Sequence, residues 1–150
     1  DAFWSAASSN FKVLAETRLA LKTGAIELLD LLDKLKMPRA IATSTDRATV
    51  DHHLGSAGIS ERFDAIVAYG DYAYGKPHPA PYITAAKRLG VDPANCLALE
   101  DSHNGVRSAA AAGMVTIMVP DLVLATEEMH ELAVQIVEDL HKVCALLDRH

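Results

Sequence analysis

The sequence predicts an α/β fold in which a parallel sheet carries helices on both faces. From about residue 25 onward, stretches with helical spacing alternate with short apolar runs, a pattern typical of strand–helix units. Polar clusters follow three of the apolar runs, where parallel sheets gather their ligand sites. Half of the residues are hydrophobic and only 5% are aromatic, so we expect a core of aliphatic side chains.

The first half of this pattern contains two predicted helices and two predicted strands. Apolar residues recur at helical spacing over residues 26–35, and a proline stops that helix before the buried run 40–42. Thr45 or Ser44 is expected to cap the next helix, because hydroxyl side chains accept the free N–H groups of a first turn. A second buried run, residues 65–68, completes this half.

The second half continues the alternation. Pro79 suits the first turn of a helix that runs to Leu89, and Gly90 follows where a left-handed cap is favoured. The same criteria predict strands over residues 97–99, 115–119 and 134–137, and helices over residues 106–112 and 139–147. We therefore place the α/β domain at residues 23–150.

Residues 1–22 differ from the rest of the chain. Their apolar residues are followed by no predicted strand before residue 40, so we expect a separate helical segment. A glycine at position 24 interrupts two helical patterns and marks the boundary. The sequence thus predicts two units, residues 1–22 and residues 23–150.

The overall charge excludes two classes of partner. With 14 basic and 20 acidic side chains the net charge is −6, so we expect neither nucleic acid nor an anionic membrane as a partner. The two cysteines have no metal-ligand spacing and are too few for a disulfide framework, which favours a reducing, cytoplasmic location. No apolar run reaches about 18 residues, so no membrane-spanning helix is expected.

Two of the polar clusters carry groups that suit phosphate. Thr43 and Ser44 offer a hydroxyl and backbone N–H groups near a helix start, although in isolation a plain helix cap is the favoured explanation of such a cluster. Lys76 lies between Gly75 and Pro77, where a rigid backbone would position its charge against a phosphoryl group. The alternative is an ordinary solvated lysine.

The third cluster is the adjacent pair Glu100 and Asp101, directly after a buried strand. Two carboxylates at a buried strand end are costly without positive charge nearby, and Mg²⁺ prefers oxygen ligands. We therefore expect the pair to bind Mg²⁺. The alternative is a cap, with Asp101 or Ser102 starting the next helix.

The order hydroxyl, lysine, acidic pair is far more specific than any one cluster. Over residues 19–122 the chain resembles the haloacid dehalogenase superfamily, in particular its sugar-phosphate phosphatase and β-phosphoglucomutase-like branch. The resemblance depends on Thr43, on Lys76 in Gly-Lys-Pro-His-Pro, and on the stretch that begins Leu-Glu-Asp-Ser-His-Asn-Gly-Val at residue 99. These segments look like the second, third and fourth motifs of that superfamily.

The resemblance implies a Rossmannoid sheet and a Mg²⁺-dependent phosphatase of small phosphorylated metabolites. Phosphoryl transfer would pass through an aspartyl-phosphate, with Thr43 and the Ser44 N–H holding the phosphate and Lys76 balancing its charge. Glu100 and Asp101 would orient Mg²⁺. Covalent catalysis of this kind divides one displacement into two easier steps.

One motif of the superfamily is absent. Its first strand carries a nucleophilic aspartate in an Asp-x-Asp pattern, and the sequence contains no such pattern. Residues 1–22 look like the last part of the helical cap that follows that strand. The missing strand would lie between the Thr43 and Glu100 strands, so we expect two unpaired edges, no independent folding and no turnover by the chain alone. The missing motif is expected either on a separate N-terminal segment, a partner that completes the sheet, or on an upstream stretch that this sequence does not include.

Several other functions are compatible with parts of this pattern. A β-phosphoglucomutase-type phosphotransferase and a non-catalytic fragment remain open. A dehalogenase is disfavoured because those relatives lack the Glu-Asp pair, and a receiver domain is disfavoured because its acidic pair precedes its Thr and Lys.

Overall fold

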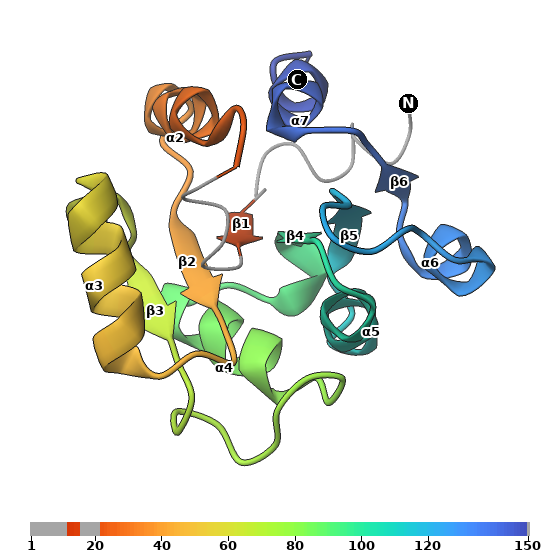
Figure 1. The fold of residues 1–150 in the computed structure, drawn as a ribbon, viewed down its shortest axis with the longest axis horizontal. Coiled ribbons are helices and arrows are strands. Elements are labelled where there is room, and N and C mark those ends of the chain that lie inside the picture. The colour runs from red at the N-terminus through yellow and green to blue at the C-terminus, as the bar shows by residue number, and fades with distance from the viewer. Residues whose placement is uncertain (1–11, 16–21, 150) are drawn as a thin grey trace.

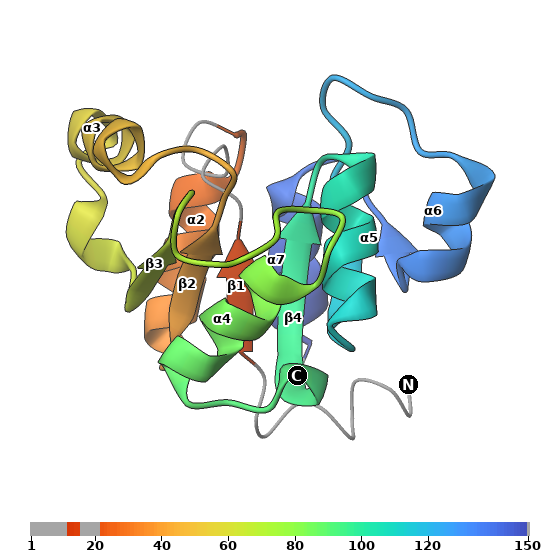
Figure 2. The same cartoon turned by 90° about the horizontal axis from the view of Figure 1, so that it is seen from below.

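The computed structural model describes residues 12–15 and 22–149. Within them, six strands form one parallel sheet in the order β3-β2-β1-β4-β5-β6. The strands are β1 (Lys12–Ala15), β2 (Arg39–Ala42), β3 (Ala65–Val67), β4 (Cys96–Glu100), β5 (Val115–Met118) and β6 (Gln135–Ile136). The strands β1 and β4 point toward the same edge, where the loops after the strands gather (Figure 2).

Helices cover both faces of the sheet (Figure 1). They are α2 (Ala25–Lys34), α3 (Arg47–Ala57), α4 (Ala80–Leu89), α5 (His103–Ala111), α6 (Glu127–Leu132) and α7 (Leu140–Leu147). The core clusters place α2, α3 and α7 on one face and α4, α5 and α6 on the other. The predicted α/β class, with a parallel sheet between two helical layers, is therefore confirmed.

The central strand β4 packs against both helical layers. Leu97 and Leu99 pack with α2 and α7, whereas Cys96 and Ala98 pack with α4 and α5. Successive side chains of a strand point to opposite faces, so Glu100 at the end of β4 falls on the α4 and α5 side. This alternation decides which neighbours each carboxylate of the acidic pair meets.

Local patterns predicted most elements but not every boundary. The α3 helix begins after Asp46, whose side chain accepts the Thr49 N–H at 3.0 Å, so the predicted cap at Ser44 or Thr45 is wrong. The short helix α6 was not predicted, because its six residues give too little periodicity. The predicted cap at Gly90 is confirmed, with a φ of 70°.

Strand β1 overturns two predictions for the start of the chain. Residues 1–22 were expected to be helical, yet Lys12–Ala15 form a strand, and residues 1–11 and 16–21 lie outside the described residues. The strand pairs with β2 on one side and β4 on the other, so the two unpaired edges expected there do not occur. Both edges need backbone partners, and four residues with extended backbone supply them.

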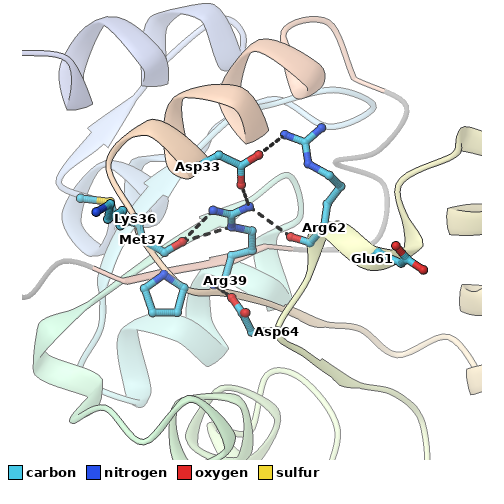
Figure 3. Close-up of a pocket in the computed structure, with 8 residues that line it drawn as sticks. Asp33, Lys36, Met37, Arg39, Glu61, Arg62 and Asp64 are labelled. Carbon is cyan, nitrogen blue, oxygen red and sulfur yellow. Dashed lines mark hydrogen bonds and ion pairs between the residues drawn. The ribbon is translucent and has the colours of Figure 1, made fainter.

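A cavity of about 460 Å³ lies at the opposite edge of the sheet, where β2 and β3 begin (Figure 3). Arg39 is buried there, and its guanidinium donates to the Met37 and Arg62 carbonyl groups and to Asp33. The Asp64 carboxylate accepts the Arg39 backbone N–H at 2.9 Å. These bonds join α2 to the two strand starts, which makes the network a structural one.

None of the helices in the described part of the chain is long and apolar enough to cross a membrane.

Candidate functional site

Three of the predicted site residues meet at the carboxyl ends of β2 and β4. Thr43 follows β2, Glu100 ends β4, and Lys76 lies in the loop between β3 and α4. The Lys76 ammonium donates to the Ala42 carbonyl at 3.0 Å and forms an ion pair with the Glu100 carboxylate. Lys76 therefore joins Ala42 and Glu100, which are 58 positions apart in the sequence, at this edge.

Lys76 is held in place by its surroundings. Its side chain is only 7% exposed, and its ammonium lies 5.1 Å from the centre of the Tyr82 ring. The interpretation as a solvated loop lysine is therefore wrong. Such a charge is stable only when it is paired and hydrogen-bonded, and the bonds to Glu100 and Ala42 meet both conditions.

Thr43 occupies a well-bonded turn. It is fully buried, its Oγ1 accepts the Thr45 N–H at 3.1 Å, and its carbonyl accepts the Tyr72 hydroxyl at 3.0 Å. Asp46 caps α3 instead of this segment, so an ordinary helix cap does not explain Thr43. Ser44 is exposed beside it.

The Glu100 carboxylate is fixed by several groups on the α4 and α5 side. Besides Lys76, it accepts the Tyr82 hydroxyl at 2.6 Å and the Ser102 hydroxyl at 3.3 Å. Gly105, in the first turn of α5, leaves the space that the carboxylate occupies, because a Cβ at this position would overlap it. Ser102 also caps α5 by accepting the Gly105 N–H, so the alternative of a helix cap at Asp101 or Ser102 applies to Ser102.

Asp101 meets a different lysine. Lys22, which precedes α2, places its ammonium 3.7 Å from Asp101 Oδ2 and 3.6 Å from Asp121 Oδ2. Each carboxylate of the adjacent pair therefore has its own lysine, Lys76 for Glu100 and Lys22 for Asp101. The pair therefore does not require a metal cation for charge balance, since lysines supply positive charge to both carboxylates.

The carboxylates still form a donor set that fits Mg²⁺. No group of three or more His, Cys, Asp or Glu side chains suited to a metal occurs among residues 22–149. Mg²⁺ commonly uses only one or two carboxylates together with water and substrate phosphate oxygens. Glu100 and Asp101, both at the carboxyl edge of the sheet, match that requirement in number and chemistry.

Sequence patterns missed the structural roles of three residues that shape this edge. Tyr82 belongs to the apolar face of α4, so its spacing indicates only core packing. Gly105 was recognised as part of a motif, but its role as space for Glu100 needs the tertiary structure. Lys22 is distant in sequence from Asp101, and no local pattern connects them.

The family model for haloacid dehalogenase-like hydrolases matches residues 3–113. The chain belongs to this haloacid dehalogenase-like hydrolase family. The matched residues include Thr43, Lys76 and the acidic pair. The match agrees with the resemblance inferred from the motifs.

The haloacid dehalogenase-like chain is similar to several named proteins and solved structures. It is 42% identical to the plasmid-encoded protein CbbY of Cupriavidus necator, over 68% of this chain and 41% of that protein. It is 35% identical to hexitol phosphatase B of Escherichia coli K12, over 71% of this chain and 48% of that protein. The crystal structure of CbbY from Rhodobacter sphaeroides in complex with phosphate matches with a TM-score of 0.77 and 30% identity, covering 87% of this chain and 62% of that one.

The haloacid dehalogenase-like chain spans about half the length of the curated relatives that it matches.

Proposed function

We propose that the chain is the phosphate- and metal-binding part of a Mg²⁺-dependent phosphohydrolase that acts on small phosphorylated metabolites. The observation that carries the proposal is the convergence of Thr43, Lys76 and Glu100 at one edge of the sheet, with the Lys76 ammonium bonded to both strand ends. The named activities of similar proteins support sugar or polyol phosphates as the substrate class.

The proposed roles follow from the chemistry of each side chain. Thr43 and the Ser44 backbone N–H hold the phosphate oxygens, and Lys76 balances the charge that develops on the transferring phosphoryl group. Lys76 is preorganised for this role by its bonds to Glu100 and Ala42. Glu100 and Asp101 hold Mg²⁺, which when bound acts as a template and Lewis acid for the phosphoryl group.

The nucleophile is the part that the sequence does not contain, because no Asp-x-Asp pattern is present. We propose that an upstream segment with this pattern supplies it and takes the central place in the sheet. Since β1 is already paired with β2 and β4, the segment would have to displace Lys12–Ala15.

Two alternatives remain within this proposal. A β-phosphoglucomutase-type phosphotransferase would use the same edge but needs a cap that holds a bisphosphate for reorientation. A non-catalytic fragment would keep the folded edge without turnover. Both differ from the phosphatase in measurable products.

The test is a chimera in which the part of hexitol phosphatase B that this chain does not cover is joined ahead of this chain. We expect Mg²⁺-dependent release of phosphate from a panel of sugar and polyol phosphates, and no turnover of p-nitrophenyl phosphate by the chain alone. Lys76→Met in the chimera is expected to lower kcat by about 100-fold or more, because an electrostatic group of this kind contributes on that order.

The controls separate folding from chemistry. Lys36→Met removes a lysine at the opposite edge of the sheet and should leave kcat unchanged. Circular dichroism checks that each chimera is folded. A folded chimera that releases no phosphate from any ester, or robust turnover by the chain alone, would contradict the proposal. Conversion of β-glucose 1-phosphate to glucose 6-phosphate would favour the mutase.

A further inference from the structure

Lys22 bridges two carboxylates beside the proposed metal site. Its ammonium lies 3.7 Å from Asp101 and 3.6 Å from Asp121, and its side chain is only 15% exposed. Asp101 is the more buried of the two, with 9% of its side chain exposed against 51% for Asp121. Lys22 therefore brings a positive charge to the carboxylate that is proposed to bind Mg²⁺.

We propose that Lys22 is an internal counter-ion that competes with the divalent cation for Asp101 and moves toward Asp121 when the cation binds. The inference depends on the proposed role of Asp101 as a metal ligand. An ammonium and Mg²⁺ close to one carboxylate repel each other, so the chain binds the cation only after Lys22 shifts. In this way Lys22 lowers the affinity of the site for the divalent cation, and it neutralises the charge of Asp101 while no divalent cation is bound.

A cavity beside Lys22 can accept its ammonium when the ammonium moves away from Asp101. Lys22 lines this cavity, of about 220 Å³, together with Asp121, Glu138 and Asp139. Three carboxylates on the walls favour an ammonium there, and the flexible lysine stem permits the movement. Asp121 therefore acts as the second anchor that holds Lys22 when Asp101 is bound to the cation.

Lys76 differs from Lys22 because its ammonium is not free to move between partners. Its ammonium is bonded to the Ala42 carbonyl and to Glu100, and its side chain is 7% exposed. Both Lys22–carboxylate distances exceed hydrogen-bonding range, whereas Lys76 forms direct hydrogen bonds. Lys22 is thus the exchangeable cation of the site, and Lys76 is the fixed one.

The test measures divalent cation binding directly, without activity. Mn²⁺ binding to residues 1–150 is followed by electron paramagnetic resonance of the free ion, and Mg²⁺ binding by calorimetry. We expect Lys22→Met to bind about tenfold more tightly than wild type, equal to about 1.4 kcal/mol. Asp121→Asn should bind roughly threefold to tenfold more weakly, because Lys22 then stays on Asp101.

The double variant Lys22→Met with Asp121→Asn distinguishes the proposed exchange from simple charge effects. If Asp121 acts through Lys22, adding Asp121→Asn to Lys22→Met changes the affinity by less than about twofold. If Asp121 attracts the cation directly, its loss weakens binding as much as in wild type, and that result overturns the exchange. Lys36→Met removes the same charge at the far edge and should bind like wild type.

Two further outcomes separate this inference from the proposed function. If Asp101→Asn abolishes binding but Lys22→Met binds like wild type, the metal site stands and the competition by Lys22 is refuted. If neither the wild type nor any variant binds Mn²⁺ or Mg²⁺, so that Asp101→Asn cannot be distinguished from the wild type, the proposed metal role fails and the inference fails with it.

Discussion

Replacing Gly105 with alanine tests whether the Glu100 carboxylate is fixed where the structure places it. A methyl group at this position would overlap both carboxylate oxygens, so the carboxylate must move. Its bonds to Lys76 and Tyr82 would then break inside the core. Disrupting a buried charge pair costs roughly 3–5 kcal/mol, whereas alanine in a helix gains at most about 1 kcal/mol over glycine. We expect a net loss of about 2–4 kcal/mol in the free energy of unfolding.

Urea unfolding followed by circular dichroism measures this loss, and a second background isolates its cause. In Glu100→Ala the carboxylate is absent, so Gly105→Ala should become neutral or stabilising by up to about 1 kcal/mol. Gly55→Ala is the matched control, because a Cβ there meets nothing closer than the Ser60 hydroxyl at 3.9 Å. The same destabilisation by Gly105→Ala in both backgrounds would refute the reasoning.

Three other predictions address the remaining contacts. Tyr82→Phe should lower the free energy of unfolding by about 2 kcal/mol, since a hydrogen bond to a buried charge is lost, and the loss should shrink in Glu100→Gln. Arg39→Met should cost roughly 2–3 kcal/mol in urea unfolding through the lost bonds to two backbone carbonyls, whereas Asp33→Asn, at a half-exposed partner, should cost under about 1 kcal/mol. The Ala68 backbone N–H donates to the Asp71 carboxylate and holds its pKa below the usual 3.8. The contribution of Asp71 to the free energy of unfolding is therefore present above that pH and is lost as the pH falls through the lower folded value. Asp71→Asn should flatten the acid unfolding curve below about pH 4.

Local patterns predicted the alternation of helices and strands because each element has its own signal. Buried runs such as β4 and capped helices such as α4 are specified within about ten residues. The approach of Thr43, Lys76 and Glu100 to one another could be predicted, because strand ends in a parallel sheet share one edge.

The start of the chain could not be predicted because its structure is set by distant partners. Lys12–Ala15 is a four-residue segment with no decisive local pattern, and it becomes a strand through pairing with β2 and β4. Short apolar segments take the conformation that their neighbours favour. The Lys22 contacts have the same origin, since Asp101 and Asp121 are brought to Lys22 only by the assembled sheet.

The acidic pair shows where a sequence argument about charge needs the geometry of a strand. Glu100 and Asp101 are adjacent, but Glu100 lies on the α4 and α5 side with Lys76, while Asp101 meets Lys22 at the start of α2. The repulsion that seemed to demand a metal is therefore divided between two lysines. A cation that binds both carboxylates must face two positive charges already in place. If one of these charges moves, the structure favours Lys22, because Asp121 offers it a second partner.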